Sequence, residues 1–131
     1  MNTIVYPHQN QLEFHKLGRI VRSANMLLVV FRNLATAVSD ASGRDDIVVF
    51  NKKLSYYDAI YDYADKVFTM LFENLAEYIE REVDCIEGTR YIVRTTLGNY
   101  LLALVYPDDK LPYIVAVPDT EIRGEECIDL T

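Results

Sequence analysis

Two arginines, Arg90 and Arg94, stand four residues apart in the apolar stretch "RYIVRTTLGNYLLALVYP" of residues 90–107. A guanidinium on an apolar strand face needs a carboxylate, an anionic ligand or water, because an unpaired buried charge is costly. A pair on one strand face suits a phosphate or carboxylate group, and Tyr91 or Tyr106 would stack on the ligand. The arginines therefore predict a site for an anionic metabolite or nucleotide. The alternative is an ion pair with an acidic residue of the second predicted helix or the C-terminal tail.

Other patterns that carry chemistry point away from catalysis. His8 and His15 are seven residues apart, without the Cys-x-x-Cys or His-Glu-x-x-His spacing of a zinc site. No Gly-x-Ser-x-Gly or phosphate-binding loop occurs, and the chain has only five glycines. A row of carboxylates along residues 58–80 is better explained as a solvated helix face than as a metal site. We therefore expect no catalytic residue, no metal and no cofactor, and the sequence favours a non-enzymatic protein.

The 131 residues suit a single domain of residues 1–131, in which half of the residues are hydrophobic. The net charge of −7 argues against nucleic acid and anionic lipid as partners. The longest apolar run, residues 26–31, is far shorter than a membrane span of about 20 residues. Cys85 and Cys127 allow one long-range disulfide. The start of the chain does not read as a signal peptide, so we predict two thiols in a reducing, cytoplasmic setting.

The helices and strands predicted around these residues indicate an α+β fold. Apolar residues recur at alternating intervals of four and three, which predicts one helix over about 11–40. A second row of apolar residues with this spacing predicts another helix over about 56–83. Three antiparallel strands are predicted at about 90–97, 100–107 and 112–118, because short turns separate them. The segment "DIVVFN" of residues 46–51 is either a strand or a buried connector. Residues 1–10 form an arm, and residues 119–131 form an acidic tail that frays.

Gly98 and Asn99 are the predicted two-residue turn of the first hairpin. The residues on one face are then paired as Leu97–Tyr100, Thr95–Leu102, Val93–Leu104 and Tyr91–Tyr106, and those on the other as Thr96–Leu101, Arg94–Ala103 and Ile92–Val105. Both faces are largely apolar, but two helices can cover only one of them. A second subunit is therefore predicted on the face that carries Ile92, with a ligand at Arg94 as the rival.

The two predicted helices carry opposite charge. Lys16, Arg19, Arg22 and Arg32 give the first helix region a net charge of +2, whereas residues 55–84 have a net charge of −6. This predicts an antiparallel helix pair in which Lys16 and Arg19 meet carboxylates of the second helix. Nucleic-acid binding through the basic side of the first helix is a third hypothesis, which the overall acidity opposes.

The leading hypothesis is a non-enzymatic interaction protein, a homodimer, that acts as an inhibitor or adaptor. Its basis is excess apolar surface, since the first helix is apolar nearly all round. The predicted interface residues are Leu27, Val30, Phe31, Ile92, Leu101 and Val105. In size and charge alone the chain resembles small proteins of phages, viruses, plasmids and toxin–immunity pairs, which suggests a viral, mobile-element or host-defence setting. The alternative is the small-molecule site at Arg90, Arg94, Tyr91 and Tyr106.

Overall fold

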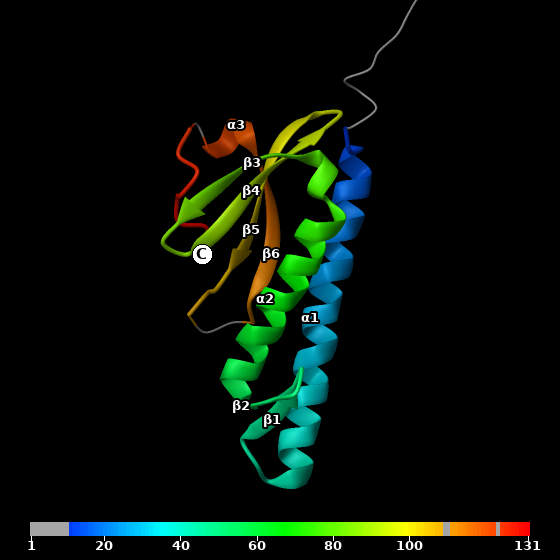
Figure 1. Cartoon of the computed structure of the whole chain (residues 1–131), viewed down its shortest axis with the longest axis vertical. Coiled ribbons are helices and arrows are strands. Elements are labelled where there is room, and N and C mark those ends of the chain that lie inside the picture. Colours follow the sequence, from blue (N-terminus) through cyan, green and yellow to red (C-terminus); the bar gives the residue numbers. More distant parts are fainter. Residues whose placement is uncertain (1–10, 109–110, 123) are drawn as a thin grey trace, which may run out of the picture.

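The fold is α+β, with two long helices, a four-stranded antiparallel sheet and a C-terminal segment in three successive layers (Figure 1). The computed structural model describes residues 11–108, 111–122 and 124–131, so the arm predicted at 1–10, with His8, lies outside the described residues. The elements are α1 (Phe14–Ser42), β1 (Asp46–Val49), β2 (Lys52–Ser55), α2 (Tyr56–Asn74), the 3-10 turn η2 (Ala76–Tyr78), β3 (Ile79–Cys85), β4 (Gly88–Thr95), β5 (Gly98–Val105), β6 (Tyr113–Pro118) and α3 (Asp119–Ile122).

The first predicted helix forms as α1, and its predicted row of apolar residues is the side that faces the core. Leu17, Ala24, Leu28 and Ala35 of this row are buried. Gly43 ends the helix in the left-handed conformation with φ 67°, and its N–H donates to the carbonyl of Ser39 at 2.9 Å. This is the glycine termination that the sequence indicates, because only glycine adopts positive φ without steric cost.

The second predicted helix is shorter than expected. It begins at Tyr56, where the Ser55 hydroxyl accepts the N–H of Asp58 at 3.2 Å, but it ends at Asn74. Residues 79–83, predicted as helix, belong to the edge strand β3, which pairs with β4. The strand is favoured because alternate residues Val83 and Cys85 turn toward one partly buried face, while pairing with β4 satisfies the backbone.

The four strands are ordered β3-β4-β5-β6, and the turn of the predicted hairpin is misplaced by two residues. Thr95 pairs with Gly98, so Thr96 and Leu97 form the turn rather than Gly98 and Asn99. The Thr95 hydroxyl holds this turn by donating to the Gly98 carbonyl at 2.5 Å and accepting the N–H of Leu97 at 3.2 Å. Every cross-strand partner changes, but each moves by an even number of residues. The predicted division into two faces therefore survives.

The segment "DIVVFN" is a strand rather than a connector. It forms β1, which pairs with β2 in a separate two-stranded hairpin whose turn residues Phe50 and Asn51 both have positive φ. Ile47 and Val49 bury one side of this hairpin against α1 and α2, at the end remote from the large sheet (Figure 1). The long connection between the helices is thus a folded hairpin that covers the end of the helix pair remote from the large sheet.

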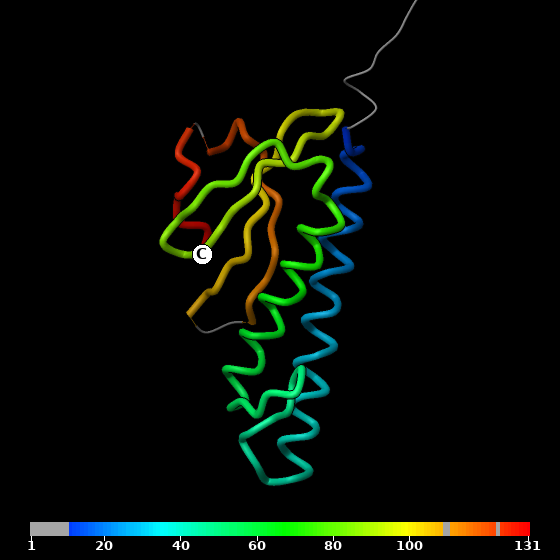
Figure 2. The backbone as a smooth tube through the Cα atoms, in the orientation of Figure 1, coloured from blue at the N-terminus to red at the C-terminus, as the bar shows by residue number. Residues whose placement is uncertain are grey.

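The second face of the large sheet is covered by the C-terminal segment of the same chain (Figure 2). Ile92 and Leu101 are buried with Ile122, and Ile128 and Leu130 pack against them. Cys85 on β3 and Cys127 form a disulfide, which corrects the prediction of two thiols. The tail predicted to fray is therefore fixed, covalently and by packing, across the sheet.

Candidate interaction surface

Arg90 holds the C-terminal segment against the sheet. The residue is only 4% exposed. One guanidinium nitrogen donates to the carbonyl of Glu126 at 2.7 Å and to that of Ile128 at 2.8 Å, and another lies 3.9 Å from the Glu87 carboxylate. These contacts engage several of the guanidinium donors, and no observation tests the ligand role of Arg90, which stays a prediction. The rival prediction, a bond to the tail, describes the observed contact, although the acceptors are mainly backbone carbonyls.

Of the predicted ligand residues, Arg90 and Tyr106 line one small pocket of about 190 Å³, whereas Tyr91 and Arg94 do not. Tyr91 lies on the opposite, helix-facing side of the sheet and stacks on Phe72 with ring centroids 4.4 Å apart. The Tyr106 hydroxyl donates to the Asp65 carboxylate on α2, and burial, with this carboxylate, raises the pKa of Tyr106. Arg94 donates to the carbonyl of Glu77 at 3.3 Å. Its buried Nε has no hydrogen-bond partner among the described residues, but no cavity with the other three surrounds it.

Three of the predicted interface residues are closed off within the chain. Ile92, Leu101 and Val105 are all buried. The prediction that a second subunit covers their face is corrected, because the C-terminal segment already lies there. Phe31 is half-buried and stacks on Tyr63 with centroids 4.0 Å apart, so it belongs mainly to the contact between α1 and α2.

Leu27 and Val30 remain open, and they belong to a larger apolar surface that we call the outer face of α1. Its large side chains are between 44 and 62% exposed and comprise Met26, Leu27, Val30, Leu34 and Val38. In Figure 1, α1 forms the margin of the molecule, with no other element on its outer side. Because Ser23, Ala37 and Ala41 share this side, it is uncharged over five turns of helix.

The outer face of α1 continues into a groove of about 400 Å³ between α1 and β1. Leu34 and Val38 form one wall, and Val48 on β1 forms the other. Asp46 lies at the rim between Arg44 and Lys53, and hydrogen bonds from both cations hold the pKa of Asp46 well below its usual range. The groove therefore has an apolar floor and a rim of already paired charges.

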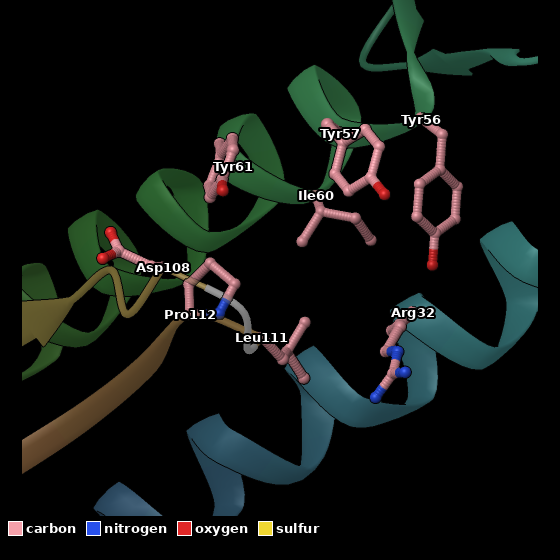
Figure 3. A pocket seen from close by; sticks show the side chains of 8 residues that line it. All are labelled: Arg32, Tyr56, Tyr57, Ile60, Tyr61, Asp108, Leu111 and Pro112. Atoms are coloured by element: carbon pink, nitrogen blue, oxygen red, sulfur yellow. The ribbon is translucent and has the colours of Figure 1, made fainter. Parts of the chain in front are cut away.

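A second cleft, of about 470 Å³, lies where α1, the start of α2 and the loop before β6 meet (Figure 3). Tyr56, Tyr57 and Tyr61 line it from α2, so part of the tyrosine cluster seen in the sequence gathers here. Arg32 on α1 and Asp108 on the loop add opposite charges. Within the described ranges Arg32 forms no ion pair, which leaves its guanidinium available to an anionic group.

The charge match predicted between the long helices is absent. Among the described residues, no ion pair joins α1 to α2, and Lys16, Arg19 and Arg22 are exposed. The helices pack instead through apolar residues such as Leu28, Ala64 and Phe68. The basic side chains thus remain on the surface of the N-terminal half of α1.

Comparison with known proteins adds no functional assignment: no family model matches the chain, and neither a curated protein nor a solved structure proves similar to it. None of the helices in the described parts of the chain has the length and apolar character needed to cross a membrane. Nor do the described side chains include a cluster of three or more histidine, cysteine, aspartate or glutamate residues arranged to hold a metal ion. Function must therefore be argued from the surfaces themselves.

Proposed function

We propose that this protein is a non-enzymatic interaction protein that associates with a second copy of itself through the outer face of α1. The observation that carries the proposal is the continuous row of exposed apolar side chains, with Leu34 61% exposed at its centre. Each buried Å² of apolar surface contributes about 25 cal/mol, and a contiguous exposed apolar surface is characteristic of interaction sites. The inhibitor or adaptor role remains part of the proposal, because such proteins act by contact rather than catalysis.

Charge supports a second copy as the occupant of this face. The chain has a net charge of −7, so two copies repel one another over most of their surfaces. The only charged residue between Arg22 and Asp40 is Arg32, which lies on the opposite side of α1 from this face. Two copies can therefore meet there without burying like charges, and a self-complementary contact closes a two-fold dimer.

Light scattering across a concentration series tests the proposal. The wild-type chain is expected to reach about 30 kDa, twice its mass of 15.1 kDa. Leu34→Lys places a charge at the centre of the outer face and should give the monomer mass at the same concentrations. Met70→Lys is the matched control, since Met70 is an apolar residue on α2 that is 54% exposed. A wild-type monomer at every concentration, or equal losses in both variants, would contradict the proposal.

A second candidate function is small-molecule binding in the tyrosine-lined cleft. The observation that favours it is that Arg32, which forms no ion pair among the described residues, lines the same cleft as Tyr56 and Tyr57 (Figure 3). An arginine next to aromatic rings suits an anionic ligand with a planar group. Thermal-shift measurements with nucleotides and aromatic acids test it, and a shift that persists in Arg32→Ala would remove this cleft from consideration.

A further inference from the structure

We infer that the two copies pair their α1 helices in antiparallel orientation, with the two-fold axis level with residue 32. This inference rests on the proposed self-association and adds its geometry. Three observations carry it: the spacing of the residues on the outer face, the position of the acidic half of the molecule, and the charges at the two ends of the face.

The spacing of the outer face is the same when read in either direction. Its central row runs Ser23, Leu27, Val30, Leu34, Ala37 and Ala41, with intervals of 4, 3, 4, 3 and 4 residues. Such a row is a coiled-coil seam, and it is symmetric about position 32. Antiparallel pairing therefore places Val30 of one copy beside Leu34 of the other, and Leu27 beside Ala37. Every residue of the row then has a partner.

The distribution of charge selects this orientation over the parallel one. Residues 79–131, which form the sheet and the C-terminal segment, contain eleven acidic and five basic residues, a net charge of −6. This acidic part lies beside the N-terminal half of α1, whereas the β1–β2 hairpin lies at the other end (Figure 1). Parallel pairing would bring both acidic parts to the same end of the dimer. Antiparallel pairing puts them at opposite ends, separated by more than a Debye length of about 8 Å.

The ends of the outer face are complementary only in the antiparallel arrangement. Arg19 lies on the same side of α1 as the row, thirteen residues before position 32, and is exposed. α1 ends at Ser42, so each Arg19 would lie just beyond the C-terminal end of the partner helix. The negative end of a helix is a favourable position for a cation. Parallel pairing would place the two Arg19 side chains together.

Single cysteine variants treated with a short bismaleimide test the geometry. Asn33 lies on the flank of the row, one residue from the axis level, so the two copies of Cys in Asn33→Cys should be neighbours and crosslink. Ala37→Cys is the control, because antiparallel pairing offsets its two copies by about 15 Å along the helices. Both positions are exposed, and the native cysteines are held in their own disulfide. In a parallel pair the result reverses, since copies of residue 37 would face each other.

We expect most Asn33→Cys protein to run at twice the chain mass on a denaturing gel, and Ala37→Cys to stay at the single-chain mass. Light scattering of the same samples separates the two proposals. A dimer that crosslinks through Ala37→Cys, or does not crosslink through Asn33→Cys, overturns the antiparallel geometry and leaves self-association standing. A monomer overturns both.

Discussion

The molecule has two apolar faces in excess of its main core, and the structure treats them differently. On the second face of the sheet, Ile92 is only 2% exposed, whereas Leu34 on the outer face of α1 is 61% exposed. Both faces are evident in the sequence as surplus hydrophobic residues. One is closed by the chain's own C-terminal segment, and the other has no cover among the described residues.

The difference shows that surplus apolar surface predicts a contact but not its partner. The sheet face is closed by a segment that supplies Ile122 and Ile128 as apolar cover and the disulfide at Cys127 as an anchor. Arg90 then satisfies two carbonyl groups of that segment. Only when such intramolecular cover has been found can the remaining face be assigned to another molecule. This is why the self-association proposal now rests on α1 alone.

The largest expected effect comes from removing the anchor of the sheet face. Cys127→Ser opens a loop with a sequence separation of 42 residues. On the loop-closure account this lowers the free energy of unfolding by about 4 kcal/mol. Urea denaturation measures it, with Cys85→Ser and the double variant as controls. The free energy of unfolding should fall by the same amount in all three variants. A larger fall in the double variant would contradict a single bond shared by the two cysteines.

Arg90→Met should come next, because it leaves two partly buried carbonyl groups without their donor. Hydrogen bonds from a charged group contribute about 1.5–3 kcal/mol, so we expect a loss of about 3 kcal/mol in urea denaturation. Arg94→Met is the control on the same strand face, with one longer hydrogen bond at 3.3 Å. Equal, small losses in the two variants would show that Arg90 does not clamp the tail.

On the other face, Leu34→Ala should weaken association while leaving the chain folded. Burying a leucine contributes about 1.5–3 kcal/mol, and a symmetric dimer loses one from each copy. The dimer dissociation constant should therefore rise about a hundredfold or more, as sedimentation equilibrium would measure. Leu97→Ala, at the exposed turn after β4, is the control and should leave the constant unchanged. An unchanged constant in Leu34→Ala would remove the outer face from the interface.

The smallest effect concerns the ion pair that helps to hold the sheet face closed. Hydrogen bonds from Arg81 lower the pKa of Glu126. Because the folded-state pKa is lower than that of the unfolded chain, about 4.3, the pair stabilises the fold above that pH. The contribution is lost as the pH falls through the lowered value. Stability below about pH 5 should therefore fall more steeply in the wild type than in Glu126→Gln. Parallel pH curves would contradict this, and Glu125→Gln serves as the control.

The sequence predicted the features that depend on periodicity. The burial of Leu17, Ala24, Leu28 and Ala35 follows directly from their 3,4 spacing in α1. The two faces of the hairpin were also assigned correctly although its turn was misplaced, because a shift by an even number of residues preserves the faces. The turn was misplaced because it was assigned to Gly98. This glycine has positive φ, but it follows the turn instead of forming it.

The features that sequence reasoning missed depend on contacts between distant residues. Leu75, Tyr78 and Ile79 continue the apolar spacing of α2, so no local signal marks the change to β3. The turn of the β1–β2 hairpin uses Phe50 at positive φ, a position where glycine or asparagine is usual. The sequence allowed the disulfide but did not indicate it, since Cys85 and Cys127 meet only after β3 joins the sheet edge and the tail crosses it.

The central claim is that one apolar face is closed within the chain and the other between chains. The most direct test is the solvent accessibility of the Leu101 and Leu34 methyl groups, measured by paramagnetic relaxation from a soluble probe over a range of protein concentrations. The account predicts that Leu101 is protected at every concentration, and that Leu34 becomes protected as the concentration rises. Persistent exposure of Leu34, or protection of Leu101 that depends on concentration, would contradict it.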